Sequence, residues 1–269
     1  MAKKYDLIVI GSGPAGEKGA AQAAFFGKRV IVIDSLPRPG GLAVSTGGIP
    51  TKAMREGAIY LSGLGQKPAA CNRRALYAPG LLMARRVEAS EIMTAAVERN
   101  LIRHGIERIL GRAHFLLPRQ VEVDTLKGER VLLEAEVVFL ASGSRPHHPT
   151  NIPMNLPGVY DSENVLDIDQ VPESLIVIGG GAVGCEYASI FAALGAHVAI
   201  VGGGHLLPTL DAEMSGMLAE CFNSMAIRVI LATSVVGVER VGSALQARLA
   251  DRRTADETEY GRRYERYVY

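Results

Sequence analysis

The sequence lacks the features of a secreted, membrane-spanning or nucleic-acid-binding protein. It holds only three cysteines, Cys71, Cys185 and Cys221, and their wide separation fits a reducing compartment. The first apolar run, in MAKKYDLIVIGSG, is too short and too soon interrupted by glycine for a signal peptide or a membrane span. The sequence also lacks an excess of positive or negative charge, because its 29 Lys and Arg residues are balanced by 28 Asp and Glu residues. We therefore expect a cytoplasmic protein whose main partner is neither nucleic acid nor a membrane.

The length and the hydrophobic content of the chain predict one large or two modest folded domains. Its 269 residues are 48% hydrophobic, which is enough for a substantial core. The segment SRPHHPTNIPMNLPG is rich in proline and breaks both the helical and the strand periodicity. This segment predicts a domain boundary near residue 150.

The first 34 residues contain a dinucleotide-binding pattern. An apolar strand from Tyr5 to Ile10 precedes G-x-G-x-x-G, and a small-residue helix and a second strand ending in Asp34 follow. The first glycine permits a tight turn, the second lets the backbone approach a pyrophosphate, and the third lets helix and strand pack closely. An acid at position 34 can bind ribose hydroxyls; the alternative is a βαβ unit without a ligand. The candidate binding residues are Gly11, Ser12, Gly13, Pro14, Ala15, Gly16, Asp34 and Ser35.

The same pattern recurs in the second half of the chain, where a strand leads to Gly179, Gly181, Val183 and Gly184. Asp34 follows Gly11 by 23 residues, and Gly202 follows Gly179 by the same 23. The second copy thus has glycine at the position of the acid, which removes the repulsion of an NADP phosphate without supplying an arginine to bind it. The sequence therefore permits NAD and NADP alike, and Gly202 could also reflect drift alone.

Between the two copies, the periodicity predicts a helix and an antiparallel meander. Residues 88–105 carry apolar side chains at helical spacing, which indicates one core-facing helix. Residues 114–142 alternate between apolar and polar side chains and turn at Lys127-Gly128. The expected fold class is α/β, with two Rossmann-like units joined by this meander. No motif indicates a metal site.

The loop GGLAVSTGGIPTK, residues 40–52, together with these elements, resembles the flavoprotein pyridine nucleotide-disulfide oxidoreductases over about residues 4–250. The family loop carries two redox cysteines, and Ala43 and Gly48 stand at their positions. Four segments resemble the soluble transhydrogenase branch of the family: GSRPHHPT (143–150), YDSENVL (160–166), GCEYASIF (184–191) and LDAEMS (210–215). That branch generally keeps the first of the two cysteines, so this chain departs from it.

The resemblance implies a role for each part of the sequence. FAD would lie on the first glycine motif and Asp34, and a nicotinamide nucleotide on the second motif. Lys52 and Glu186 would form a pair beside the nicotinamide, with the Lys52 ammonium near the flavin; alternatively, Glu186 is a solvated charge at a helix start. Ala113 would contact the adenine through its backbone. The other residues implied at the flavin are Gly40, Gly41, Thr46, Gly47, Ser142 and Gly143.

The implied activity is hydride transfer between NADPH and NAD through FAD, which requires no sulfur. Disulfide reduction requires a thiolate, so a dihydrolipoamide dehydrogenase-like activity is disfavoured. The resemblance also implies an FAD-binding domain in residues 1–150, an NAD(P)-binding domain in 151–269 and a three-layer ββα architecture. The family is homodimeric, but its dimerisation domain and returning flavin segment have no counterpart here. We thus expect a truncated chain, disordered from about residue 250, for which non-catalytic nucleotide binding is the alternative function.

Overall fold

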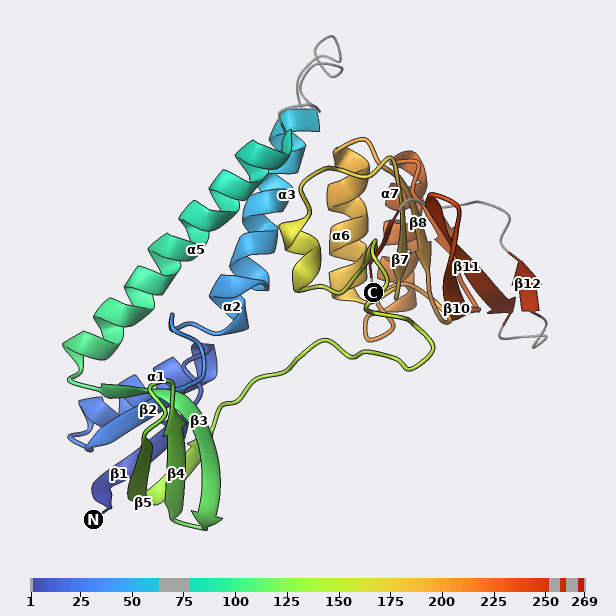
Figure 1. The fold of residues 1–269 in the computed structure, drawn as a ribbon. Helices are drawn as coiled ribbons and strands as arrows, with labels where there is room; N and C mark the ends of the chain where they lie inside the picture. Colours follow the sequence, from blue (N-terminus) through green and yellow to red (C-terminus); the bar gives the residue numbers. More distant parts are fainter. Residues whose placement is uncertain (1, 63–77, 252–256, 260–265, 269) are drawn as a thin grey trace. The chain divides into compact units, whose positions relative to one another are not determined.

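The structure is a computed structural model that describes residues 2–62, 78–251, 257–259 and 266–268 (Figure 1). Two compact units make up the chain: Met1–Pro50 with Val87–Arg145, and Thr51–Arg86 with Pro146–Tyr269. Residues 51–86 belong to the second compact unit, and Met54 and Ala58 pack into its core. The FAD-binding domain in residues 1–150 and the NAD(P)-binding domain in residues 151–269 are defined by their cofactors, and both stay a prediction. Cys71 lies outside the described residues.

A parallel strand pair and a helix begin the first unit. Strands β1 (Lys3–Ile10) and β2 (Val30–Asp34) pair in parallel, and α1 (Pro14–Phe25) connects them. All five residues of β2 are buried, as expected of a strand covered on both faces. The predicted strand–turn–helix–strand order is therefore present, with the second strand ending at Asp34.

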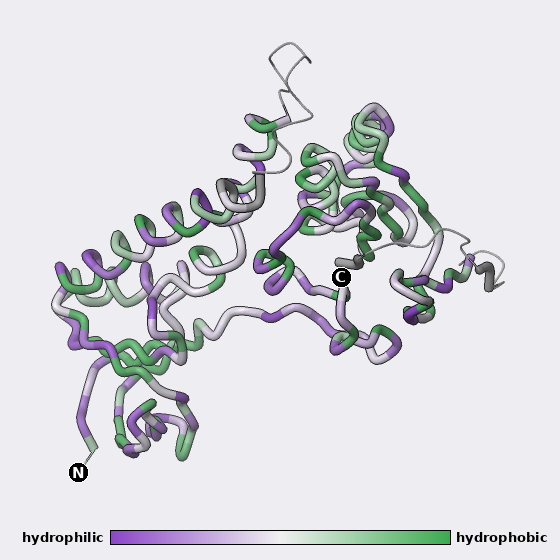
Figure 2. Tube along the Cα trace, turned by 45° about the horizontal axis from the view of Figure 1, so that its top comes forward, coloured by the Kyte–Doolittle hydropathy of each residue, from purple (hydrophilic) through white to green (hydrophobic). Residues whose placement is uncertain are grey.

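The helix between the two glycine motifs is longer than the sequence predicted. Helix α5 covers Ala78–Arg103, whereas the periodicity predicted residues 88–105. Its end is set at Gly105, whose φ of +63° reverses the chain before the next strand. Figure 2 shows hydrophilic and hydrophobic residues alternating along this helix. Two further helices, α2 (Leu42–Ser45) and α3 (Gly48–Ser62), follow the first glycine motif along the chain.

The predicted antiparallel meander is present and closes on the parallel strands. It consists of β3 (Glu107–Leu117), β4 (Gln120–Thr125) and β5 (Arg130–Leu140). The first residues of β3 pair in parallel with β2 and the later ones antiparallel with β4, while β5 pairs with both β4 and β1. The five strands thus form a closed ring of pairings. Fully buried Val121, Val123 and Leu133 fill the space between its two sides.

The second unit repeats the order of strand, glycine turn, helix and strand. Its elements are β6 (Val159–Tyr160), the 3-10 helix η2 (Asn164–Asp167), β7 (Ser174–Ile178), α6 (Ala182–Ala193), β8 (His197–Val201), α7 (Ala212–Ser224) and β9 (Arg228–Ile230). Strands β7, β8 and β9 are neighbours in a parallel sheet. Tyr187, Ile190 and Phe191 bury one face of α6 in the unit's core.

The remaining strands of the second unit come from the end of the described chain. Strands β10 (Thr233–Val241), β11 (Ala244–Asp251) and β12 (Glu257–Glu259) form an antiparallel sheet. Strand β13 (Arg266–Val268) pairs in parallel with both β6 and β7. Disorder is predicted from about residue 250, but in the described part of that segment β12 and β13 are strands. Neighbouring strands supply their hydrogen bonds, which the local periodicity does not reveal.

Candidate nucleotide-binding sites

The first glycine turn is built so that two of its glycines cannot be replaced without a backbone shift. Gly11 has φ +104°, and a Cβ there would overlap the Ala141 carbonyl oxygen. A Cβ on Gly16 would overlap the Gly11 carbonyl oxygen. At Gly13, by contrast, the nearest atom to an added Cβ is the Gly41 Cα, 4.0 Å away. Gly11 and Gly16 therefore serve packing, while Gly13 leaves room beside the turn.

Asp34 and the loop after β2 meet at Ser12. The Asp34 Oδ2 accepts the Ser12 amide at 2.9 Å and also contacts the Ser12 hydroxyl, while its Oδ1 accepts the Leu36 amide at 2.8 Å. The Gly40 amide donates to the Ser12 carbonyl oxygen at 3.0 Å. A carboxylate offers about four acceptor positions, so Asp34 can still accept one ribose hydroxyl while it holds the turn.

The N-terminus of α1 presents free donors. Among the residues that the structure describes, no side chain caps this helix at Gly13. Pro14 has no N–H, so Ala15 and Gly16 carry the first amides of the turn. In α7, where no glycine motif exists, the Asp211 carboxylate caps the helix by accepting the Glu213 amide at 2.8 Å. Uncapped amides at a helix N-terminus suit a phosphate, so the residues present fit the pyrophosphate of FAD.

The loop that resembles the redox-cysteine loop is held by its backbone. The Thr46 and Gly47 amides donate to the Leu42 carbonyl oxygen at 3.2 and 2.6 Å. Gly40 and Gly41 have φ of +112° and +58°, a region that favours glycine. Ala43 and Gly48 carry no sulfur, so this loop cannot form a disulfide.

The other residues predicted at the flavin lie in the first unit. Ser142 and Gly143 follow Ala141, whose carbonyl oxygen touches Gly11, and Gly143 has φ +72°. Ser35 directly follows Asp34 at the end of β2. Ala113 lies in β3 opposite Val123 and packs partly into the meander core. Contacts within the first unit therefore bring the glycine turn together with Asp34, the loop at Gly40 and Ala141. Ala113 lies in the antiparallel meander instead.

The second glycine turn repeats this arrangement. Gly179 has φ +118°, and a Cβ on Gly184 would overlap the Gly179 carbonyl oxygen. Gly181 caps α6 without a side chain, and nothing lies within 4 Å of its Cβ position. The amides of Ala182, Val183 and Gly184 begin the helix, so the pyrophosphate of a second dinucleotide fits here on the same grounds.

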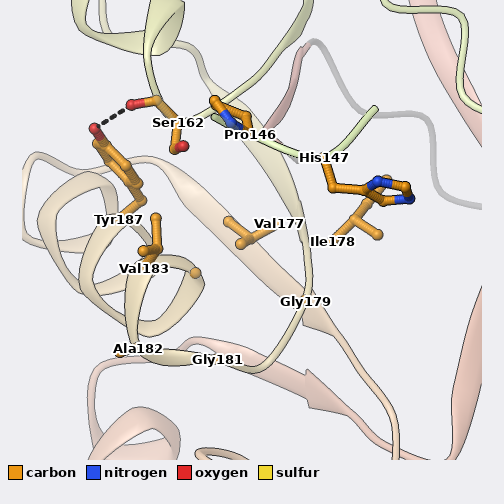
Figure 3. A pocket seen from close by; sticks show the side chains of 11 residues that line it. Pro146, His147, Ser162, Val177, Ile178, Gly179, Gly181, Ala182, Val183 and Tyr187 are labelled. Carbon is orange, nitrogen blue, oxygen red and sulfur yellow. Dashed lines mark hydrogen bonds between the residues drawn. The ribbon is translucent and has the colours of Figure 1, made fainter. Parts of the chain in front are cut away.

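Two cavities flank this second turn, and Ile178 and Gly179 line both of them. The α6-side cavity has a volume of about 320 Å³ and is lined further by Pro146, His147, Ser162, Val177, Gly181, Ala182, Val183, Gly184 and Tyr187 (Figure 3). The β8-side cavity has about 220 Å³ and is lined further by Pro149, Asn151, Ile152, Val201, Gly202, Gly203, Thr233, Ser234 and Val235. One extended ligand that crosses the glycine turn can therefore reach both.

Gly202 lies at the β8-side cavity. A Cβ on this residue would be 3.1 Å from the Gly180 amide nitrogen, so a side chain here would press on the glycine turn. The cavity lining contains neither a carboxylate nor a cationic side chain. Its hydrogen-bonding side chains are neutral, which leaves the choice between NAD and NADP open, as the sequence did.

Lys52 and Glu186, predicted to form a pair, do so within the second unit. Their Nζ and Oε1 atoms are 2.5 Å apart, and 65% of the Lys52 side chain and 21% of the Glu186 side chain are exposed. Glu186 belongs to α6, four residues before Ile190, which is buried in the core. The less exposed glutamate, on α6, thus holds the ammonium of the more exposed lysine side chain.

Several residues that line the cavities were not predicted from the sequence: His147, Asn151, Ser162, Tyr187, Thr233 and Ser234. The Tyr187 hydroxyl donates to the Ser162 carbonyl oxygen at 2.9 Å (Figure 3). Burial, with a smaller effect of the Glu186 charge, raises the pKa of Tyr187, so the phenol stays protonated and keeps this bond. A signal for His147 and Tyr187 existed, because both lie in the segments that resemble the transhydrogenase branch.

The thiol of Cys185 lies beside the second turn in an environment that disfavours its thiolate. Cys185 is buried in α6, and its Sγ lies 3.5 Å from the Gly180 carbonyl oxygen. Burial raises its pKa to about 11, so the thiolate is scarce at neutral pH. Among the described side chains, no group of three or more metal-ligating residues gathers. No helix in the described part of the chain is long and apolar enough to cross a membrane.

The fold and the two turns define a class: a mixed α/β protein in which two strand–turn–helix units each offer uncapped amides to a phosphate group. The family model described as pyridine nucleotide-disulphide oxidoreductase matches residues 5–261, so the chain belongs to that family. The family predicted from the loop and the two glycine motifs is thereby confirmed. It is a family of oxidoreductases, and it implies FAD and a nicotinamide nucleotide as cofactors.

The similar proteins carry two kinds of name. Soluble pyridine nucleotide transhydrogenase from Mycobacterium bovis BCG is 33% identical over 247 residues, which are 90% of this chain and 53% of that protein. The transhydrogenase from Marinomonas sp. is 36% identical over 222 residues, which are 81% and 47%. The HOCl-induced flavoprotein disulfide reductase RclA from Escherichia coli, in its Cu(II) complex, shares the fold with a TM-score of 0.82 at 24% identity; the match covers 99% of this chain and 56% of RclA. The chain thus spans about half the length of the relatives it matches.

Proposed function

We propose that the chain is an FAD-dependent oxidoreductase of transhydrogenase type that transfers hydride between NADPH and NAD without a redox disulfide. In this proposal residues 1–150 form a Rossmann-type FAD domain. Residues 151–269 form a Rossmann-type NAD(P) domain. The names of the transhydrogenase relatives support the substrates.

The observation that carries the proposal is a flavin-type loop without sulfur. Ala43 and Gly48 occupy the two cysteine positions, while the neighbouring Gly41 still approaches Gly13 closely enough that an added Cβ would lie 2.9 Å from the Gly13 Cα. Reduction of a disulfide needs a thiolate at this loop. Hydride exchange between two nicotinamides does not, so it is the family chemistry that these residues support.

Each part of the chain would contribute positioning and charge. A bound flavin would supply the hydride-accepting ring. The amides of Ala15 and Gly16 would hold its pyrophosphate, and Asp34 would accept a hydrogen bond from its ribose. The Lys52 ammonium, held by Glu186, would stabilise negative charge on the reduced ring. Gly202 would leave the adenosine site open to both NAD and NADP.

The visible spectrum of the purified chain tests this proposal. We expect a yellow protein that NADPH bleaches under anaerobic conditions and that NAD then recolours. Gly13→Leu should abolish the colour, because its side chain would fill the space beside the turn. Gly216→Leu, at an open position of α7, is the matched control and should stay yellow. A colourless wild-type chain that does not take up added FAD would overturn the proposal.

A second function, nucleotide binding without catalysis, is favoured by the end of β5. Leu140, the last residue of this strand, is 61% exposed and directly precedes Ala141 at the glycine turn. An exposed apolar side chain beside the turn favours a ligand site that is incompletely covered. In that case FAD or NADH would raise the melting temperature, while NADPH would not reduce any bound flavin.

A further inference from the structure

We propose that residues 146–152, which we name the strap, are a nucleotide-binding element of the second unit. His147 would contact the nicotinamide side of the dinucleotide and Asn151 the adenosine side. The ion pair between His148 and Asp161 would position the strap. This inference rests on the nicotinamide-nucleotide site of the proposed function and identifies residues of that site to which neither glycine motif points.

The strap lines both cavities, one after the other. Pro146 and His147 belong to the α6-side cavity, whereas Pro149, Asn151 and Ile152 belong to the β8-side cavity. Figure 3 shows Pro146 and His147 on one side of the α6-side cavity and Val183 with Tyr187 on the other. A ligand that crosses the glycine turn would therefore lie between that turn and the strap.

An anchor lies between the two lining parts of the strap. The His148 Nε2 atom is 2.8 Å from the Asp161 Oδ2, and only 10% of the Asp161 side chain is exposed. The Asp161 Oδ1 accepts the amides of Glu163 and Asn164, both at 2.9 Å. Asp161 is thus fixed by its own loop, which also carries Ser162 of the α6-side cavity, and it can hold the strap in place.

A second anchor acts at the end of the strap and leaves an acceptor available. The Asn151 Nδ2 donates to the Val235 carbonyl oxygen at 2.8 Å. Within the described ranges, no donor contacts the amide oxygen of Asn151, although the residue lines the β8-side cavity beside Gly202. This oxygen can accept a hydrogen bond from an adenosine ribose hydroxyl.

The two cavities correspond to the two ends of a dinucleotide. In a strand–turn–helix unit the pyrophosphate lies at the helix N-terminus, here Gly181–Gly184, and the adenosine ribose lies at the end of the second strand, here Gly202. The α6-side cavity is then left for the nicotinamide nucleotide. The His147 imidazole N–H can donate to a phosphate oxygen or a ribose hydroxyl there.

Calorimetric titration of the complete chain with two half-ligands tests the assignment. The probes are ADP, for the adenosine side, and reduced nicotinamide mononucleotide, for the other side; NADH is the whole ligand. We expect His147→Ala to weaken NADH and the mononucleotide about fivefold or more, the loss of one hydrogen bond. ADP should change less than twofold. Asn151→Ala should weaken ADP and NADH instead. His197→Ala, at the opposite end of β8, is the matched control and should change none of them.

The positioning role of His148 needs a readout that separates it from folding. His148→Ala should weaken both half-ligands, because the whole strap loses its anchor. His148→Gln, which can still donate to Asp161, should restore most of the affinity. Thermal unfolding of each variant is measured alongside, and affinity that followed melting temperature in every variant would overturn the positioning role.

The results distinguish this inference from the proposed function. A wild-type chain that binds NADH while His147→Ala, Asn151→Ala and His148→Ala bind it equally well overturns the strap and leaves the site intact. A wild-type chain that binds none of the three probes overturns the nicotinamide-nucleotide site itself and the strap with it.

Discussion

At the second glycine turn, we predict that substitution of Gly184 lowers the stability of the fold, whereas substitution of Gly181 lowers the affinity for NADH. A Cβ on Gly184 would overlap the Gly179 carbonyl oxygen and lie 3.3 Å from the Val177 Cγ1, whereas a Cβ on Gly181 meets nothing within 4 Å. The obstacle to Gly184→Ala is backbone, which cannot rotate away, so α6 must shift from β7. Overpacking of this kind costs about 2 kcal/mol. For a chain of this size, this lowers the melting temperature by about 4–8 °C.

Gly181→Ala should leave stability within about 0.5 kcal/mol of wild type, because the loss of a favourable N-cap residue is offset by a less flexible unfolded chain. Its methyl group would instead lie where a pyrophosphate approaches the amides of Val183 and Gly184. Each hydrogen bond to a charged group contributes about 1.5–3 kcal/mol, so we expect NADH affinity to fall about tenfold or more.

The assays are thermal unfolding followed by circular dichroism and calorimetric titration with NADH, on the same preparations. Gly204→Ala, another open position of the second unit, is the matched control for both. If Gly181→Ala proved as destabilising as Gly184→Ala, or left NADH affinity unchanged, the separation into a packing glycine and a ligand glycine would be refuted.

Three further predictions concern single side chains. Asp211→Ala should lower the free energy of unfolding by about 1 kcal/mol because α7 loses its N-cap, while Asp211→Asn retains most of it, as chemical denaturation can show. Burial raises the pKa of Asp161, but the amide hydrogen bonds and His148 outweigh burial and leave it below its ordinary value. Its contribution to stability is therefore present above about pH 4 and is lost as the pH falls through the lowered pKa, so Asp161→Asn should flatten the acid side of a plot of melting temperature against pH. Alkylation at pH 8, mapped by mass spectrometry, should modify exposed Cys221 and spare Cys185 until the chain unfolds, because burial raises the pKa of Cys185 to about 11.

Local chemistry explains why much of the fold was predictable. The strand ends at Ile10, Asp34 and Val201 follow from glycine turns and apolar runs that involve only neighbouring residues. The turn between β4 and β5 was predicted because Gly128 supplies its positive φ. The start of α5 at Ala78 was not predicted, although Pro79 in the first helical turn is a recognised start signal.

Contacts between distant segments explain what was not predictable. The ring of β1 to β5 depends on β3 changing from a parallel to an antiparallel partner at Gly111, where a Cβ would overlap the Asp124 carbonyl oxygen. The cavities need residues 146–152 to lie beside Gly179 and Val235, which no periodicity encodes. The glycine motifs therefore predicted the two turns whose helix N-termini suit a phosphate, while the walls of the cavities became visible only in three dimensions.

The conformation of the loop at residues 40–52 does not depend on cysteine side chains. Its conformation depends on the positive φ of Gly40 and Gly41 and on amides that donate to the carbonyl oxygens of Ser12 and Leu42. None of these backbone interactions involves the side chain at position 43 or 48. Sulfur in such a loop serves chemistry, while glycine and the backbone serve geometry. In the proposed function, the absence of cysteine at positions 43 and 48 therefore removes disulfide exchange and leaves the loop able to lie against a flavin.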